Sequence, residues 1–216
     1  MKTVIRFLAV AGLLWLPLQW AEARPITFTG GQVLVTEAQA DQWQWRYTYS
    51  HSFRHSSSLG GVYVDDLRDV GDLRLTYARA AWLARRWNQP TSQGNLFVWG
   101  GLGQARTDLD TGVGRHVGLQ ADWETRRVYT SLVSELHDGR DWRFSQHTVS
   151  LGIAPFEHDY DRTALWLVAK GMRSTGRVDN DTKAALVLRW FNPRWWLEAG
   201  VDSNGKPVGF FMINIF

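Results

Sequence analysis

Apolar and polar residues alternate with a period of two along several segments of the chain. The segment 115–124 is the clearest case, because its odd positions include Val117, Leu119, Ala121 and Trp123, whereas its even positions hold polar residues or glycine. The segments 183–191 and 195–202 can be interpreted in the same way. Since successive side chains of a strand point to opposite faces, these segments are predicted to be strands with one apolar face.

No apolar run after residue 23 approaches the roughly 20 residues that a membrane-spanning helix needs. If the mature protein enters a membrane, it must therefore do so as a closed barrel. Asp138-Gly139 and Asn204-Gly205 suit the tight hairpins of such a fold. We predict an all-β, antiparallel, up-and-down transmembrane β-barrel of ten strands, in a range of eight to twelve because segments 32–36 and 61–65 could add strands. The predicted strands are 43–53, 72–84, 95–105, 115–124, 127–137, 141–153, 163–171, 182–191, 194–202 and 207–216.

The first 23 residues have the features of a cleaved secretory signal peptide. Lys2 and Arg6 precede an apolar run, and the small residues Ala21 and Ala23 close it. Residues 24–42 are then expected to form an N-terminal periplasmic segment and residues 43–216 the barrel in the outer membrane. An even number of strands leaves both termini in the periplasm, so that segments 56–71, 106–114 and 172–181 become outer loops.

Tryptophan is unusually frequent. Of the 13 tryptophans, only Trp15 and Trp20 lie in the first 23 residues. The others are too many for an ordinary core of this size, whereas amphipathic rings are favourable at the two interfaces of a membrane. The predicted membrane-interface aromatics are Trp43, Trp45, Trp123, Trp190 and Trp195.

Composition excludes several classes of protein. The chain has no cysteine, which excludes disulfides and a lipid-anchoring cysteine after the signal. Its 24 basic and 21 acidic residues are nearly balanced, which gives no electrostatic argument for binding nucleic acid. His51 and His55 at a strand end, and Asp108 and Asp110 before a turn, lack the further ligands of a metal site. No metal and no cofactor are predicted.

Charged residues of both signs fall on the predicted inner face of the barrel. In a narrow barrel such side chains are expected to pair and fill the lumen, whereas a selective pore favours one sign. The inner positions are predicted to include Arg74, Asp122, Glu124, Arg127, Glu135, Arg143, Lys170, Lys183, Arg189 and Glu198. The predicted lumen network comprises Asp122, Glu124, Arg127, Glu135, Lys183, Arg189 and Glu198.

The last segment resembles the C-terminal assembly signal of bacterial outer-membrane β-barrels. It ends in Phe216, with Met212 and Phe210 in phase behind it, whereas Asn214 departs from the apolar or aromatic residue that is usual there. The resemblance implies recognition by the outer-membrane assembly machinery. It identifies a class of proteins and no family within that class.

A second resemblance concerns the segment 53–58. It is similar to the His-x-Ser-Asn stretch of the outer-membrane lipid A deacylase family, although Ser58 replaces the asparagine. The resemblance implies that His55 acts as the base and Ser57 as the nucleophile, on the lipid-facing side at the outer end of the first strand. No third carboxylate can be assigned. The alternative is a polar strand end that continues into a serine-rich loop.

These observations predict an integral outer-membrane barrel with a salt-bridged interior and a structural or surface-binding role. The alternatives are a lipid A acyl-ester hydrolase that uses His55 and Ser57, and a narrow outer-membrane channel. We expect a monomer whose partners are outer-membrane lipids, including lipopolysaccharide, and the assembly machinery.

Overall fold

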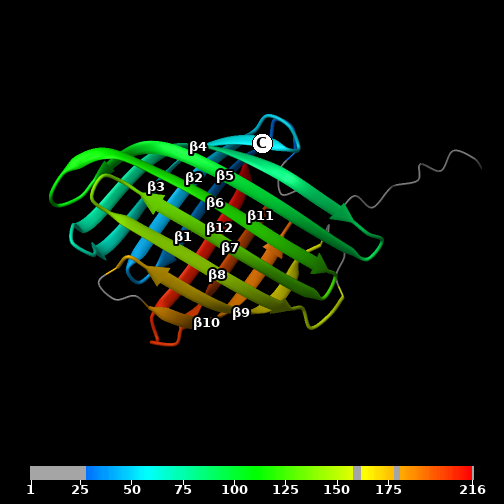
Figure 1. Ribbon diagram of the computed structural model, residues 1–216. Helices are drawn as coiled ribbons and strands as arrows, with labels where there is room; N and C mark the ends of the chain where they lie inside the picture. The colour runs from blue at the N-terminus through cyan, green and yellow to red at the C-terminus, as the bar shows by residue number, and fades with distance from the viewer. Residues whose placement is uncertain (1–27, 158–161, 178–180, 216) are drawn as a thin grey trace, which may run out of the picture.

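Twelve antiparallel strands form one closed barrel in the computed structural model, which describes residues 28–157, 162–177 and 181–215 (Figure 1). Each strand pairs with its neighbours in the sequence, and β1 pairs with β12, from Gln32 opposite Ile215 to Ala38 opposite Gly209, to close the ring. The predicted all-β, up-and-down fold is therefore confirmed. The strands are β1 Gln32–Gln39, β2 Gln42–Ser50, β3 His55–Leu67, β4 Gly71–Asn88, β5 Ser92–Arg106, β6 Thr111–Thr125, β7 Val128–Asp138, β8 Arg143–Ile153, β9 Ala164–Thr175, β10 Thr182–Asn192, β11 Trp195–Asp202 and β12 Pro207–Ile215.

The count of ten is wrong by two strands, although twelve lies within the expected range. Both additional strands, β1 and β3, contain the segments noted as possible strands. β3 is hard to recognise because Gly60 and Gly61 interrupt its apolar pattern. A Cβ on Gly60 would lie 2.6 Å from the ring of Tyr77, and a Cβ on Gly61 would lie 2.6 Å from Nε1 of Trp45. The neighbouring rings therefore require glycine where an apolar residue would have indicated a strand.

Segment 24–42 is not a separate periplasmic segment as expected, because β1 belongs to the barrel wall. The predicted signal peptide and residues 24–27 lie outside the described residues. We call the end that carries the start of β1 and the end of β12 the terminal end, and the other the distal end. Segment 56–71 is mainly β3 instead of a loop, so the predicted direction of the first strand is reversed. The 106–111 and 175–182 connections lie at the distal end, as expected for outer loops.

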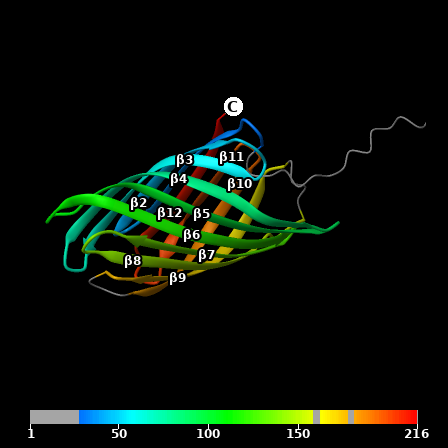
Figure 2. The ribbon, with the colours of Figure 1, turned by 45° about the horizontal axis from the view of Figure 1, so that its top comes forward.

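The barrel wall is taller on one side. β4 has 18 residues and β5 and β6 have 15 each, whereas β1 and β11 have 8. Figures 1 and 2 show these long strands running obliquely around the barrel. Within the described residues, no helix is long and apolar enough to cross a membrane.

The outer surface is apolar along the strands. Leu102, Val117, Leu151 and Leu188 are more than half exposed, and a bilayer is the environment in which such a surface is stable. Tryptophans lie near both ends of the wall. Trp43 is 50% exposed near the distal end, and Trp190 packs edge to face against Trp195 at the terminal end with their ring centroids 5.6 Å apart. Trp45 and Trp123 also lie on the outer surface, so all five predicted aromatics face outward.

Apolar side chains fill much of the interior. One cluster, which includes Leu67, Leu73, Trp142 and Phe144, packs between the β3–β4 turn and the β7–β8 loop at the distal end. A second cluster lies along β9 and β10 and includes Val168 and Val187. The interior is thus packed by apolar contacts in part, and not by salt bridges alone as predicted. These clusters reduce the space that remains in the lumen.

Candidate functional site in the barrel lumen

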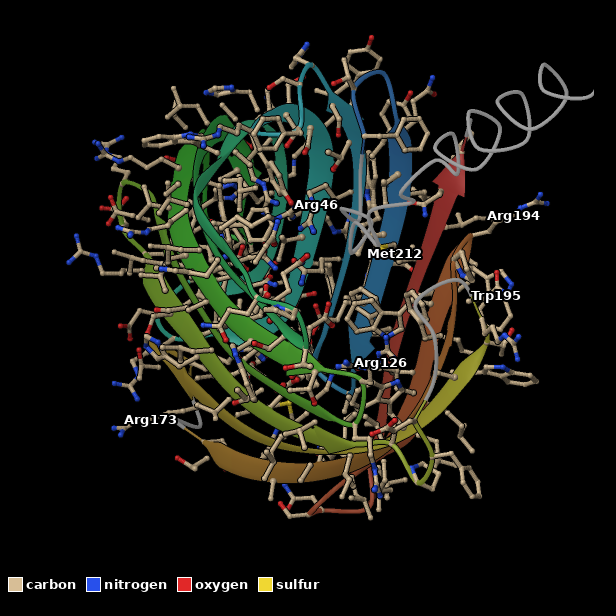
Figure 3. The ribbon with its side chains drawn as sticks, turned by 90° about the vertical axis from the view of Figure 1, so that its right-hand side faces the viewer. Arg46, Arg126, Arg173, Arg194, Trp195 and Met212 are labelled. Carbon is tan, nitrogen blue, oxygen red and sulfur yellow. The ribbon has the colours of Figure 1, made fainter. Side chains whose placement is uncertain are left out.

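Two adjoining cavities occupy the remaining lumen. The central chamber has a volume of about 280 Å³, and the terminal chamber, nearer the termini, has a volume of about 130 Å³. Figure 3, a view into the barrel, shows Arg46 and Met212 on the inner side of the wall and Arg173 and Trp195 on its outer side. The residues that line both chambers are Arg86, Phe97, Gln120, Tyr129, Arg189, Trp196 and Met212. The two chambers therefore adjoin each other across these side chains.

Glu198 on β11 is the centre of one charged cluster in the central chamber. It accepts hydrogen bonds from Lys170 and, at 2.7 Å, from Nε of Arg189. The Arg189 guanidinium also lies over two rings, 4.1 Å from the centroid of Tyr129 and 4.2 Å from that of Trp196. Register explains this arrangement, since Arg189 and Glu198 are direct partners in adjacent strands. The structure thus places these two predicted lumen residues in contact.

Glu135 on β7 is the centre of a second cluster. Its Oε1 accepts a hydrogen bond of 2.9 Å from Nε1 of Trp99 and lies 3.6 Å from Nη1 of Arg79. The Arg79 guanidinium is stacked 4.6 Å from the centroid of Trp99. Gly118 makes room for the Trp99 indole, because a Cβ at that position would lie 2.5 Å from its ring atoms. Arg79 and Trp99 were absent from the predicted network.

The terminal chamber contains the acidic pair Asp122 and Glu124 at the end of β6. Asn95 donates a hydrogen bond of 2.7 Å to one oxygen of Asp122, and Gln120 donates one of 2.8 Å to the other. Arg86 donates a hydrogen bond of 2.7 Å to Asn95. Within the described residues, Glu124 forms neither a hydrogen bond nor an ion pair. Both acids face the lumen, as predicted from their alternate positions in the strand.

Polar residues from five connections or strands form contacts at the distal end, and we call this group the distal clasp. Arg177, which follows β9, forms a 2.7 Å ion pair with Asp41 in the β1–β2 turn and donates a hydrogen bond to Gln42. Gln42 also donates a hydrogen bond of 2.9 Å to Gln146 on β8, and Lys183 lies 3.5 Å from Asp41. Burial by itself would raise the pKa of Asp41, but the charges of Arg177 and Lys183 outweigh it, so that the net pKa is below its ordinary value. Gln146 also lines the central chamber, so the clasp adjoins that chamber.

Three of the residues predicted to face inward do not do so. Arg127 is exposed in the β6–β7 turn, where its guanidinium reaches the carbonyl oxygen of Pro155 at 3.4 Å. Arg74 and Arg143 are also exposed. The cause is local, since Arg127 belongs to a turn and the inner face near Arg74 and Arg143 is taken by Leu73, Leu75 and Phe144. Lys183 faces inward, but it belongs to the distal clasp.

The structure does not bring His55 and Ser57 together as a base and a nucleophile. Ser57 Oγ lies 2.8 Å from Nε2 of His51, whereas His55 Nδ1 lies 3.2 Å from Oγ of Ser52. These residues lie at the terminal end, because β3 begins there, and not at the outer end as predicted. Ser57 borders a hollow of about 780 Å³ on the outside of the wall. No three histidine, aspartate or glutamate side chains within the described residues are placed to hold a metal ion.

The predicted assembly signal lies partly inside the barrel. Phe210 and Met212 line the central chamber, and Asn214 lines the terminal chamber. This inward position gives a reason for a polar residue at 214, whose Nδ2 donates a 3.0 Å hydrogen bond to the carbonyl oxygen of Pro193. Phe216 lies outside the described residues.

No protein-family model matches the sequence, and no curated protein matches it either. A solved structure described as the KdgM porin in complex with disordered oligogalacturonate is similar in fold. Its TM-score is 0.51 and its sequence identity is 9%, and the match covers 86% of this chain and 98% of the porin chain. At this identity the likeness concerns the fold alone: the chain is a closed, porin-like β-barrel of twelve strands.

Proposed function

We propose that the protein is a narrow channel of the outer membrane that passes small polar solutes. The observation that carries the proposal is the pair of adjoining chambers, lined in part by charged and polar side chains, inside a closed barrel with an apolar outer surface. A barrel with a purely structural role has no need of an interior cavity, which costs packing energy. The similarity in fold to a porin supports the same assignment.

The proposed orientation places the termini in the periplasm and the distal clasp at the cell surface. An even number of strands and long distal hairpins are typical of bacterial outer-membrane barrels. In this orientation the apolar wall contacts the membrane lipids, and the clasp separates the central chamber from the exterior. The resting channel is therefore closed at its outer mouth.

The charge of the lumen argues against strong selection for anions. The two chambers are lined by five basic residues, Arg46, Arg79, Arg86, Lys170 and Arg189, and by five acidic residues, Glu37, Asp122, Glu124, Glu135 and Glu198. A pore that selects by charge is lined by an excess of one sign. The porin neighbour is described in complex with oligogalacturonate, but the balanced lumen leads us to expect no preference for such a polyanion here.

The proposal can be tested with the purified barrel in planar bilayers and in liposomes. We expect small, infrequent openings from the unmodified protein and larger, steady conductance from Arg177→Gln, because this variant loses the ion pair with Asp41. Liposomes that contain Arg177→Gln should swell in small sugars more slowly as the sugar becomes larger. If neither protein conducts ions or passes sugars, the barrel is a structural or surface-binding protein and the channel proposal is wrong.

A further inference from the structure

Three side chains in the terminal chamber have oxygen acceptors without a hydrogen-bond donor. Glu124 forms no hydrogen bond or ion pair with the part of the chain that the structure describes. Oε1 of Gln93 and Oδ1 of Asn214 are buried and accept no hydrogen bond. Gln93 is only 5% exposed and lines the chamber. Buried polar atoms without partners are rare in folded proteins, and a bound ion or ligand that donates to these oxygens would satisfy them.

The strand register concentrates these acceptors at one place. Gln93 pairs with Glu124, and Asn95 pairs with Asp122 two residues further along, so all four side chains project from the same patch of the β5–β6 ladder. Asn214 reaches the chamber from β12 on another part of the wall. Asp122 has both oxygens occupied by amide donors, and each carboxylate oxygen has a second lone pair available. The chamber is thus rich in acceptors from two sides.

The two carboxylates of the chamber have no direct cationic partner within the described residues. Arg189 lines the chamber, but it lies 2.7 Å from Glu198, a carboxylate that it shares with Lys170. Arg86 also lines the chamber, and no ion pair joins it to Asp122 or Glu124 within the described residues. Solvent screening is weak in this confined space, so the carboxylate of Glu124 is available to a cationic ligand.

Aromatic rings complete the lining. Phe97 and Phe191 border the chamber beside the acceptors, and the nearby rings of Tyr129 and Trp196 already hold the guanidinium of Arg189. Carboxylates together with ring faces form a favourable environment for an organic ammonium group, which offers N–H donors and a positive charge.

We infer that the terminal chamber binds a small organic ammonium group, held by Glu124, Asp122, Gln93 and Asn214, and that it gives the channel a preference for cationic amines. This inference rests on the proposed function, since it makes the chamber the selecting site of the channel. The volume of about 130 Å³ limits the bound group to a few non-hydrogen atoms. The unpaired carboxylate of Glu124 that attracts the amine also disfavours anions of the same size.

Binding is measured on the full barrel in detergent, without any need for conduction. The probes are ethanolamine, ethylene glycol and glycolate, which have similar size and differ in charge. We expect ethanolamine alone to change tryptophan fluorescence and raise Tm in a saturable manner. Glu124→Gln should weaken its binding roughly ten- to a hundredfold, as expected for the loss of a charge-assisted hydrogen bond. Asp141→Asn, which removes an equivalent charge from an exposed distal loop, should bind normally.

A second variant covers the case in which Glu124→Gln does not fold. Gln93→Glu adds a negative charge at the unpartnered acceptor and should tighten ethanolamine binding. Equal effects of the three probes, or unchanged binding in both variants, would overturn the site. Saturable binding of Ca²⁺ without binding of ethanolamine would also overturn it and would assign the oxygens to a metal ion. If the barrel binds ethanolamine but does not conduct, only the channel proposal is wrong. If it conducts but does not bind ethanolamine, only this inference is wrong.

Discussion

Arg177 and Asp41 lie 2.7 Å apart across the distal mouth, although they are far apart in the sequence. Arg177 is 4% exposed, and it also donates a hydrogen bond to Gln42, which in turn bonds to Gln146 on the far side of the mouth. One arginine thus connects the β9–β10 connection to the β1–β2 turn and, through Gln42, to β8. These side-chain contacts across the distal mouth can separate without any change in the strand pairing.

The first prediction is that Arg177→Gln opens the mouth and lowers stability. The variant leaves Asp41 without its closest cation, and because the Asp41 side chain is 30% exposed we expect a cost of about 1 to 3 kcal/mol. Conductance in a planar bilayer should rise while Tm in detergent falls. Arg140→Gln is the matched control, since Arg140 is an exposed distal arginine whose closest carboxylates lie 3.9 Å away. An equal rise in both variants would show that the clasp does not control the mouth.

Acid should open the same mouth. Burial opposes ionisation of Asp41, but the charges of Arg177 and Lys183 outweigh it and lower the pKa of this carboxyl in the folded protein. A group with a depressed pKa stabilises the fold above its unfolded pKa, and this stabilisation is lost as the pH falls through the folded value. Conductance of the unmodified protein should therefore rise below about pH 4. Asp41→Asn should show high conductance already at pH 7, and little further change on acidification.

The alternation of residues predicted most of the wall but not its full extent. Strands such as β6 and β10 have a continuous apolar face, which is visible in the sequence. In β3, the ring of Tyr77 packs over Gly60 and the ring of Trp45 packs over Gly61. The glycines in β3 are therefore explained by side chains of adjacent strands, which the sequence of β3 alone does not reveal. Because β1 and β3 were not predicted, strand 43–53 was given the wrong direction and His55 was placed at the wrong end of the barrel.

The sequence predicts which side chains face the lumen where inward and outward positions alternate regularly along a strand. Asp122, Glu124, Glu135, Arg189 and Glu198 face inward because they alternate with outward apolar residues. The distal clasp was not predictable, because Arg177 is in a connection and its partners are distant in the sequence. The apolar packing at the distal end was missed for a similar reason, since Leu67 is the last residue of β3 and Trp142 lies in the β7–β8 connection.

Gly118→Ala should disturb the Glu135 cluster. The new Cβ would lie 2.5 Å from the indole of Trp99, which must move and weaken both its hydrogen bond to Glu135 and its stacking with Arg79. Overpacking of this kind costs about 1 to 3 kcal/mol. Tryptophan fluorescence and Tm should both change. Gly171→Ala is the control, because no atom lies within 4 Å of a Cβ there, and a similar loss in that variant would indicate a general intolerance of the strands.

The last prediction concerns the Glu198 cluster, where two cations share one buried carboxylate. Glu198 is 2% exposed and compensates both Lys170 and Arg189. Glu198→Gln leaves these two charges facing each other in the lumen, and removal of one member of a buried ion pair costs roughly 3 to 5 kcal/mol. Urea unfolding of the barrel in detergent should show this loss. Glu157→Gln, at an exposed position, should unfold as the unmodified protein does. The double variant Glu198→Gln, Lys170→Met should recover part of the stability, because it removes one of the uncompensated charges. If the double variant is no more stable than Glu198→Gln, the cost comes from lost hydrogen bonds and not from charge.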